Sequence, residues 1–257
     1  MSASLLQTPE DPQAQPVQGP PGAACVASTR LIDSAHPAVV AFAQRHAVGA
    51  NTRERAVALT LAVRDGFRYD PYRIDLSPAG MCASQVLTIG VGWCVTKAAL
   101  LAAACRAVGI PARVGYADVR NHLSTERMRS QMQTDLFVWH GYTDIWIDDA
   151  DNDEGGNDQG GSDEGGAWRK ATPAFNIELC DRFGLLPLDF DGRSDSLYHR
   201  FDRSGQRHME YVRQHGSFDD MPLARIVADF RATYPGWNAP ATPGSFLADV
   251  ARETGPG

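Results

Sequence analysis

The chain has 257 residues, of which 43% are hydrophobic, and this is enough to bury a sizeable core in one domain. No stretch reaches the roughly 18 consecutive apolar residues that a membrane helix needs, so we expect no membrane partner. The formal charge of −7 is concentrated in residues 148–166, which contain eight acids and no base, and the rest of the chain is close to neutral. A near-neutral body lacks the basic face of a nucleic-acid-binding protein, so no nucleic-acid partner is expected.

The first 27 residues are rich in Pro, Gln and Ala without hydrophobic periodicity, and this predicts a disordered N-terminal tail. They have neither the basic start nor the apolar core of a secretory signal, so we expect a cytoplasmic protein. The five cysteines contain no CxxC pair, which argues against a disulfide framework and a thiolate zinc site and fits a reducing compartment. Neither a metal nor a cofactor is expected.

Helical patterns open the predicted domain, which we place at residues 28–235. One helix follows His36 and Pro37, and a second covers residues 53–63. Asp65 and Gly66 end the second helix, and residues 67–75 are expected to be extended and to lead into a turn.

The central segment predicts a helix followed by strands. Apolar residues recur at helical spacing from Cys94 to Val108, and Gly109 and Pro111 end the pattern. The many alanines indicate that this helix packs closely on more than one side. Strands are predicted at residues 112–119 and 136–147, separated by a polar helical or irregular excursion at residues 120–134.

The acidic, glycine-rich residues 148–166 predict a solvated loop inserted at a hairpin tip, since loop closure costs little more as a loop lengthens. The returning strand is predicted at residues 168–175. A further helix is expected at residues 223–233, and residues 236–257 form a predicted C-terminal tail.

Cys94 is the candidate nucleophile. A thiol attacks carbonyls as the thiolate, so its pKa must be lowered, and a helix N-terminus supplies positive potential and free N–H groups for this. Gly90 and Gly92 let the chain turn tightly before Cys94, and the same N–H groups can hold an oxyanion. The other four cysteines are expected to be small buried hydrophobic residues.

His140 is the candidate base. It stands in the middle of a predicted strand among apolar residues, in the segment FVWHGY, where a buried ring needs polar partners. A hydrogen-bonded core histidine is the alternative interpretation. The other six histidines lie in helices, in the polar excursion or in the C-terminal part of the chain.

The segment GWCVTKAALLAAACRAVGIPARVGYADV resembles the cysteine segment of the transglutaminase-like superfamily, in the form of a bacterial-type stand-alone domain. HGYTDIWI is similar to the histidine strand of that family, and Trp168 to the tryptophan that opens its next strand. The resemblance covers about residues 50–176. It implies an α+β, papain-like fold with the cysteine at the N-terminus of a buried helix packed on an antiparallel sheet. It also implies a Cys–His–acid triad, with Cys94 as nucleophile and His140 as general base and then acid.

The third member of the implied triad departs from the family. The usual aspartate, four residues after the tryptophan and before a proline, is replaced by Thr172. Asp144 shares a face with His140 but lies about 13 Å along the same strand. The family register places Thr172 opposite His140, whereas a simpler hairpin register places Asn176 there. We predict Asn176, because an amide oxygen orients the histidine in papain-like proteases.

Together these features predict a thiol-dependent acyl-transfer enzyme, with a cysteine peptidase or amidase favoured over a transglutaminase because water is always available. Its expected partner is a peptide or amide substrate. The alternative is a catalytically inactive transglutaminase-like binding module, motivated by the missing aspartate. A redox-sensing thiol is a third possibility, and the sequence offers it no evident resolving cysteine. The sequence does not indicate the oligomeric state.

Overall fold

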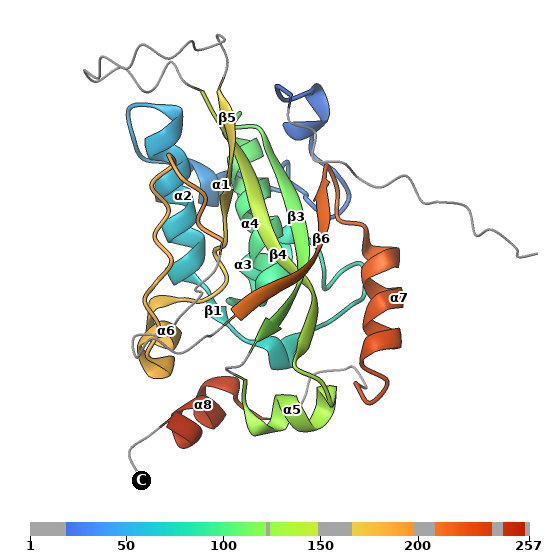
Figure 1. The fold of residues 1–257 in the computed structure, drawn as a ribbon. Coiled ribbons are helices and arrows are strands. Elements are labelled where there is room, and N and C mark those ends of the chain that lie inside the picture. The colour runs from blue at the N-terminus through green and yellow to red at the C-terminus, as the bar shows by residue number, and fades with distance from the viewer. Residues whose placement is uncertain (1–18, 122–123, 149–165, 198–208, 238–243, 255–257) are drawn as a thin grey trace, which may run out of the picture.

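The structure, a computed structural model, describes residues 19–121, 124–148, 166–197, 209–237 and 244–254. Four antiparallel strands form its main sheet, in the order β5-β4-β3-β6. They are β3 (Ala112–Asn121), β4 (Leu136–Ile147), β5 (Ala167–Ala171) and β6 (Met209–Phe218). Helix α4 (Cys94–Ala107) packs against β3 and β4, behind the sheet in Figure 1. The predicted α+β fold, with Cys94 at the start of a helix on an antiparallel sheet, is confirmed.

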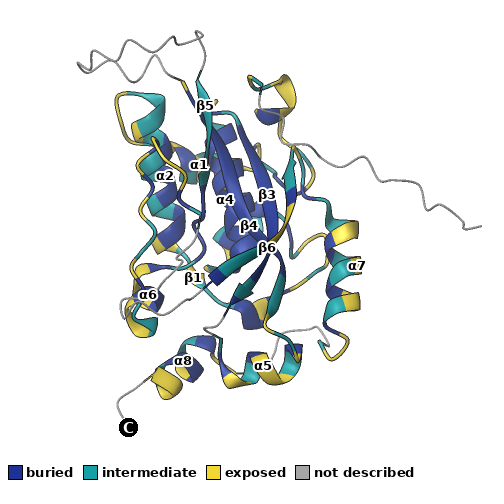
Figure 2. Cartoon of the chain, viewed as in Figure 1, coloured by how far each residue is buried: buried dark blue, intermediate teal, exposed yellow. Residues whose placement is uncertain are grey.

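Helix α4 is the centre of the core. Every residue of it except Ala107 is buried, and the helix is mostly dark blue in Figure 2. Its alanines keep the helix thin, so that α1 (Pro37–His46), α2 (Thr52–Gly66) and α3 (Ala83–Ile89) pack against it as well as the sheet. A helix that is apolar on all sides is expected to be enclosed on all sides, and this one is.

The remaining elements surround this core. Two-residue strands β1 (Arg68–Tyr69) and β2 (Val91–Gly92) pair in parallel, and the 3-10 helix η2 (Pro71–Arg73) follows β1. The predicted polar excursion contains α5 (Glu126–Met132), and the predicted helix at 223–233 is α7 (Leu223–Thr233). Helix α6 (Ile177–Phe183) was not predicted. In the described ranges, no helix has the length and apolar character needed to cross a membrane.

Residues 19–27 and 246–254, which lie near the two ends of the chain, form structure where the sequence predicts tails. Residues 19–27 were assigned to the tail, but they contain the 3-10 helix η1 (Ala23–Cys25), and Cys25 is buried. They are held because the carbonyl of Ala27 accepts from the buried Arg106 guanidinium at 2.8 Å, and that of Gly19 from the Trp168 indole at 3.0 Å. Residues 1–18 lie outside the described part of the chain.

The predicted C-terminal tail contains helix α8 (Phe246–Thr254), which packs against α6. Its Phe246 and Val250 are buried, and the carboxylate of Asp249 accepts from the Tyr72 hydroxyl at 2.9 Å and from Arg127 Nε at 2.7 Å. The prediction of a tail over residues 236–257 is therefore wrong for residues 246–254, because their apolar side chains are buried against the domain and the Asp249 carboxylate is hydrogen-bonded to it.

The hairpin of β4 and β5 has neither of the two registers predicted from the sequence. Thr143 pairs with Ala171. Relative to this pairing, the register that places Thr172 opposite His140 is shifted by two residues in one direction, and the register that places Asn176 there is shifted by two residues in the other. Strand β5 ends at Ala171 rather than at residue 175, because Thr172 bonds elsewhere: its N–H donates to the Ser196 carbonyl and its hydroxyl to that of Leu197. The predicted acidic insertion lies almost wholly outside the described residues.

Candidate active site

Cys94 is the first residue of α4, where backbone N–H groups are free. Trp93 is the N-cap, and its N–H donates to the Thr96 hydroxyl at 3.2 Å. Backbone N–H groups of Cys94, Val95 and Gly141 lie within hydrogen-bonding reach of the thiol, and each lowers its pKa. Two of these N–H groups are among those that a helix N-terminus leaves free, and the third comes from β4.

Gly141 allows β4 to approach the start of α4. A Cβ atom added at this glycine would lie 2.9 Å from the Val95 Cα and 3.0 Å from the Cys94 carbonyl oxygen. Two residues further along β4, the Thr143 hydroxyl donates to the Ala98 carbonyl at 2.9 Å. The strand that carries His140 is therefore anchored directly on the first two turns of α4.

Cys94 and His140 line the same small cavity, whose volume of about 30 Å³ is the space of roughly one water molecule. The rest of its lining is almost wholly apolar and aromatic: Tyr69, Pro71, Ile74, Trp93, Met128, Met132, Phe137, Val138, Phe230, Tyr234 and Trp237. Both polar side chains are buried, with exposed fractions of 6% for Cys94 and 5% for His140. The structure thus brings together the two residues that the sequence singled out.

Burial controls the protonation of this pair. It raises the pKa of the Cys94 thiol to about 11, against the lowering effect of the three N–H groups. It lowers the pKa of His140 to about 4. Both groups are therefore neutral at pH 7, because burial outweighs the helix terminus that is expected to lower the thiol pKa. Among the described residues, no hydrogen bond joins the His140 ring to Cys94.

The backbone just before His140 is bent by a β-bulge. Ala117 pairs with His140 and Val119 with Phe137, so that two residues of β4 oppose Asp118 alone. One of the two, Trp139, has a φ of 59°, which is uncommon for a residue with a side chain.

Buried polar groups hold the bulge in place. The Asp118 carboxylate accepts from the Trp139 N–H at 3.0 Å and lies 2.6 Å from His215 Nε2. The His215 ring stacks on the Trp139 ring with a centroid distance of 4.1 Å, and the indole N–H donates to Asp229 at 2.7 Å. The orientation of His140 therefore depends on contacts made by its neighbour.

The third member predicted for the triad has other partners. The Asn176 side-chain oxygen accepts from the Tyr69 N–H at 3.0 Å, and the Thr172 hydroxyl donates to Leu197. In the part of the chain that the structure describes, neither side chain is hydrogen-bonded to His140. The hairpin registers that placed them opposite His140 are wrong, and a catalytic role for Asn176 stays a prediction.

Asp144 is engaged at the far end of β4. It forms ion pairs with Arg113 at 3.5 Å and Lys170 at 3.7 Å, and it accepts a hydrogen bond from the Ser217 hydroxyl.

Buried polar residues in and near the site are not predicted by the sequence. Lys97, one turn after Cys94, is fully buried, and its ammonium donates to the carbonyls of Arg64, Phe67 and Ala174 at 2.6–2.8 Å. Burial lowers the pKa of Lys97 to about 7, whereas the three carbonyls favour the charged form because only it donates three hydrogen bonds. A lone lysine in an alanine-rich helix was the available signal.

Tyr234 closes the cavity from α7. Its hydroxyl accepts from the Val138 N–H at 2.8 Å and donates to the Leu136 carbonyl at 2.9 Å, so it holds the chain just past the end of α7 on the start of β4. Nothing in its local sequence indicated this. Trp93 also lines the cavity, whereas the Tyr142 ring packs over Gly115.

Comparison with known protein families places the chain in one of them. A family model described as the transglutaminase-like superfamily matches residues 40–171, just over half of the chain, including Cys94 and His140. No curated protein matches the chain. A crystal structure of a candidate cysteine protease from Cytophaga hutchinsonii is similar at 19% identity, with a TM-score of 0.38. The match covers 76% of this chain and 52% of that one, so the chain spans about half the length of that protein. The extent of the family match shows that the chain belongs to the transglutaminase-like superfamily.

Proposed function

We propose that the chain is a thiol-dependent hydrolase that cleaves a peptide or amide bond through an acyl-enzyme on Cys94. Membership of the transglutaminase-like superfamily supports a thiol-dependent enzyme in general. The observation that carries the finer proposal is that Cys94, at a helix N-terminus, and His140 line one buried cavity.

The proposed reaction begins from neutral groups. His140, whose pKa of about 4 leaves its ring unprotonated at pH 7, accepts the thiol proton as the sulfur attacks the carbonyl carbon. Backbone N–H groups of Val95 and Gly141 lie where they can donate to the developing oxyanion. The imidazolium then protonates the leaving amine, and a thioester forms on Cys94.

Hydrolysis completes the cycle. The now neutral His140 accepts a proton from water as that water attacks the thioester carbonyl. Collapse of the second tetrahedral intermediate expels the sulfur, which recovers the proton from His140 and releases a carboxylic acid. If a primary amine replaces water in this step, the same residues carry out transfer, which is why acceptor access decides between the two outcomes.

The experiment is cleavage of a synthetic peptide pool, followed by mass spectrometry of the new termini. Wild type is compared with Cys94→Ala, His140→Ala and, as a control, Cys82→Ala, which removes a thiol outside the cavity. We expect cleavage by wild type and the control, and loss of roughly a thousandfold or more in the first two variants. Adding ethanolamine and searching for amide products separates transfer from hydrolysis.

A catalytically inactive binding module is the second candidate. It is favoured by the replacement of the family aspartate by Thr172 and by the lack of a His140–Cys94 hydrogen bond among the described residues. The pH dependence of Cys94 alkylation discriminates between the two. The enzyme proposal is refuted if peptide binding does not increase the alkylation rate of the buried Cys94 and if His140→Ala does not change that rate.

A further inference from the structure

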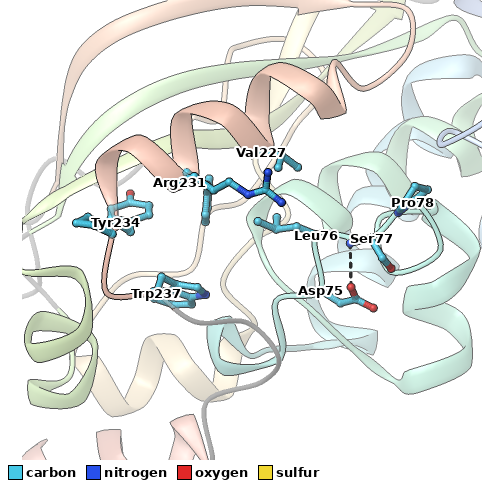
Figure 3. Close-up of a pocket in the computed structure, with 10 residues that line it drawn as sticks. Asp75, Leu76, Ser77, Pro78, Val227, Arg231, Tyr234 and Trp237 are labelled. Carbon is cyan, nitrogen blue, oxygen red and sulfur yellow. Dashed lines mark hydrogen bonds between the residues drawn. The ribbon is translucent and has the colours of Figure 1, made fainter.

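A groove lies next to the Cys94 cavity, between α7 and the loop that follows η2. Its volume is about 890 Å³, whereas the cavity itself has room for about one water molecule. Figure 3 shows its lining, with Val227, Arg231 and Tyr234 on one side and Leu76 on the other. A substrate must therefore extend into space outside the cavity, and the groove is large enough to hold several residues of a peptide.

The groove and the cavity are neighbours that share part of their lining. Phe230, Tyr234 and Trp237 line both of them. The Phe230 ring also makes an edge contact with Trp93, the residue before Cys94, at a centroid distance of 5.5 Å. A chain whose scissile amide reaches Cys94 can thus lie along these aromatic rings into the groove.

Two charged side chains line the groove, and they are not equivalent. The Asp75 carboxylate turns into its own loop, where it accepts from the Ser77 N–H at 2.9 Å and packs against Gly80 (Figure 3). The Arg231 side chain extends from α7 towards Leu76 across the groove in Figure 3. Among the described residues no carboxylate forms an ion pair with Arg231, so its guanidinium is available to a ligand.

From this geometry we infer that the groove binds a peptide substrate through apolar contacts and through a carboxylate that pairs with Arg231. The inference rests on the proposed function for the chemistry at Cys94 and adds a substrate class, namely peptides with an acidic group. A guanidinium recognises a carboxylate through two parallel hydrogen bonds, which gives geometric as well as charge selectivity. The carboxylate belongs either to an acidic side chain or to a free peptide C-terminus.

Binding to the Cys94→Ser variant tests the inference without turnover. The probes are fluorescein-labelled heptapeptide pools, each with one fixed Glu or Gln and a C-terminal amide, and matched Gln pools with a free C-terminus. Fluorescence anisotropy gives the affinity of each pool. We expect the Glu pool or the free-carboxylate pool to bind about tenfold more tightly than the neutral pool. The arm that shows the preference identifies the source of the carboxylate.

Substitution of Arg231 supplies the decisive comparison. In the Cys94→Ser background, Arg231→Gln should make the affinities for the acidic and neutral pools about equal. Arg231→Glu should reverse the preference in favour of a matched Lys pool. Arg182→Gln on α6, which removes the same charge from an exposed helix, should keep the preference. Equal binding of acidic and neutral pools, or a preference that survives Arg231→Gln, overturns the inference. Failure of the proposed function has a different signature, because wild type would then bind the acidic pool selectively and not cleave it.

Discussion

Replacement of Gly141 by alanine tests how the site is assembled. The added Cβ would lie 2.9 Å from the Val95 Cα and 3.0 Å from the Cys94 carbonyl oxygen, and both are backbone atoms that no rotamer change can move away. Either β4 must retreat from α4 or the first turn of α4 must shift. Each response moves His140 relative to Cys94.

The magnitude follows from overpacking a core contact, which costs about 1–3 kcal/mol. For a chain of this size each kcal/mol lowers the Tm by about 2–4 °C. A displacement of about 1 Å at reacting groups costs on the order of a hundredfold in rate, so the loss of activity should exceed what the loss of stability explains.

Thermal unfolding and peptide cleavage would be measured on the same samples. Gly66→Ala is the matched control, because a Cβ there meets no atom within 4 Å and the residue ends helix α2. We expect this control to be as stable as wild type or slightly more so. If Gly141→Ala unfolds at the wild-type temperature and cleaves peptides at the wild-type rate, the close approach of β4 to α4 is not required as described.

Three further predictions concern buried polar groups. Burial lowers the pKa of His140 from 6.5 to about 4, so the unfolded chain binds a proton at a higher pH than the folded chain does. Up to about 3 kcal/mol of stability should therefore be lost as the pH falls from 6.5 to 4. Urea unfolding of His140→Gln should lack this component of the pH dependence. Lys97→Met leaves three carbonyls without their donor and should cost about 3 kcal/mol or more in urea unfolding, whereas Lys170→Met, at a partly exposed side chain, should cost less. Asp118→Ala removes the acceptor of the Trp139 N–H, so it should destabilise the protein by about 2 kcal/mol and slow peptide cleavage. Asp118→Asn keeps an acceptor oxygen and should retain most of the stability and most of the cleavage rate. Equal defects in the two variants would contradict the proposed role of the bulge.

Local patterns predicted the centre of the fold well. The helix from Cys94 is marked by apolar spacing and by Gly109 and Pro111 beyond its end. All of these signals lie within one short stretch of the sequence. The β-branched and aromatic run of β4 is equally local. The start and end of α7 were predicted at the residues where they are found.

Features that depend on distant contacts could not be predicted. Strand β5 ends at Ala171 because Ser196 and Leu197 accept the hydrogen bonds of Thr172, and no pattern near Thr172 indicates these distant partners. Helix α8 is short, and it becomes part of the fold through Asp249 and Tyr72, which are far apart in the chain. The protonation of Cys94 was also beyond local reasoning, because the helix terminus is visible in the sequence whereas the cavity walls come from several segments.

The wall that Tyr234 and its neighbours form can be changed separately from the candidate nucleophile and base. The segment matched by the family model ends at residue 171, whereas Phe230, Tyr234 and Trp237 come from beyond it. The candidate nucleophile and base thus lie inside the matched segment, and one side of their surroundings lies outside it. Substitutions at these wall positions should accordingly change which molecules reach Cys94 while leaving Cys94 and His140 themselves unaltered, and a library randomised at these positions is a route to altered selectivity.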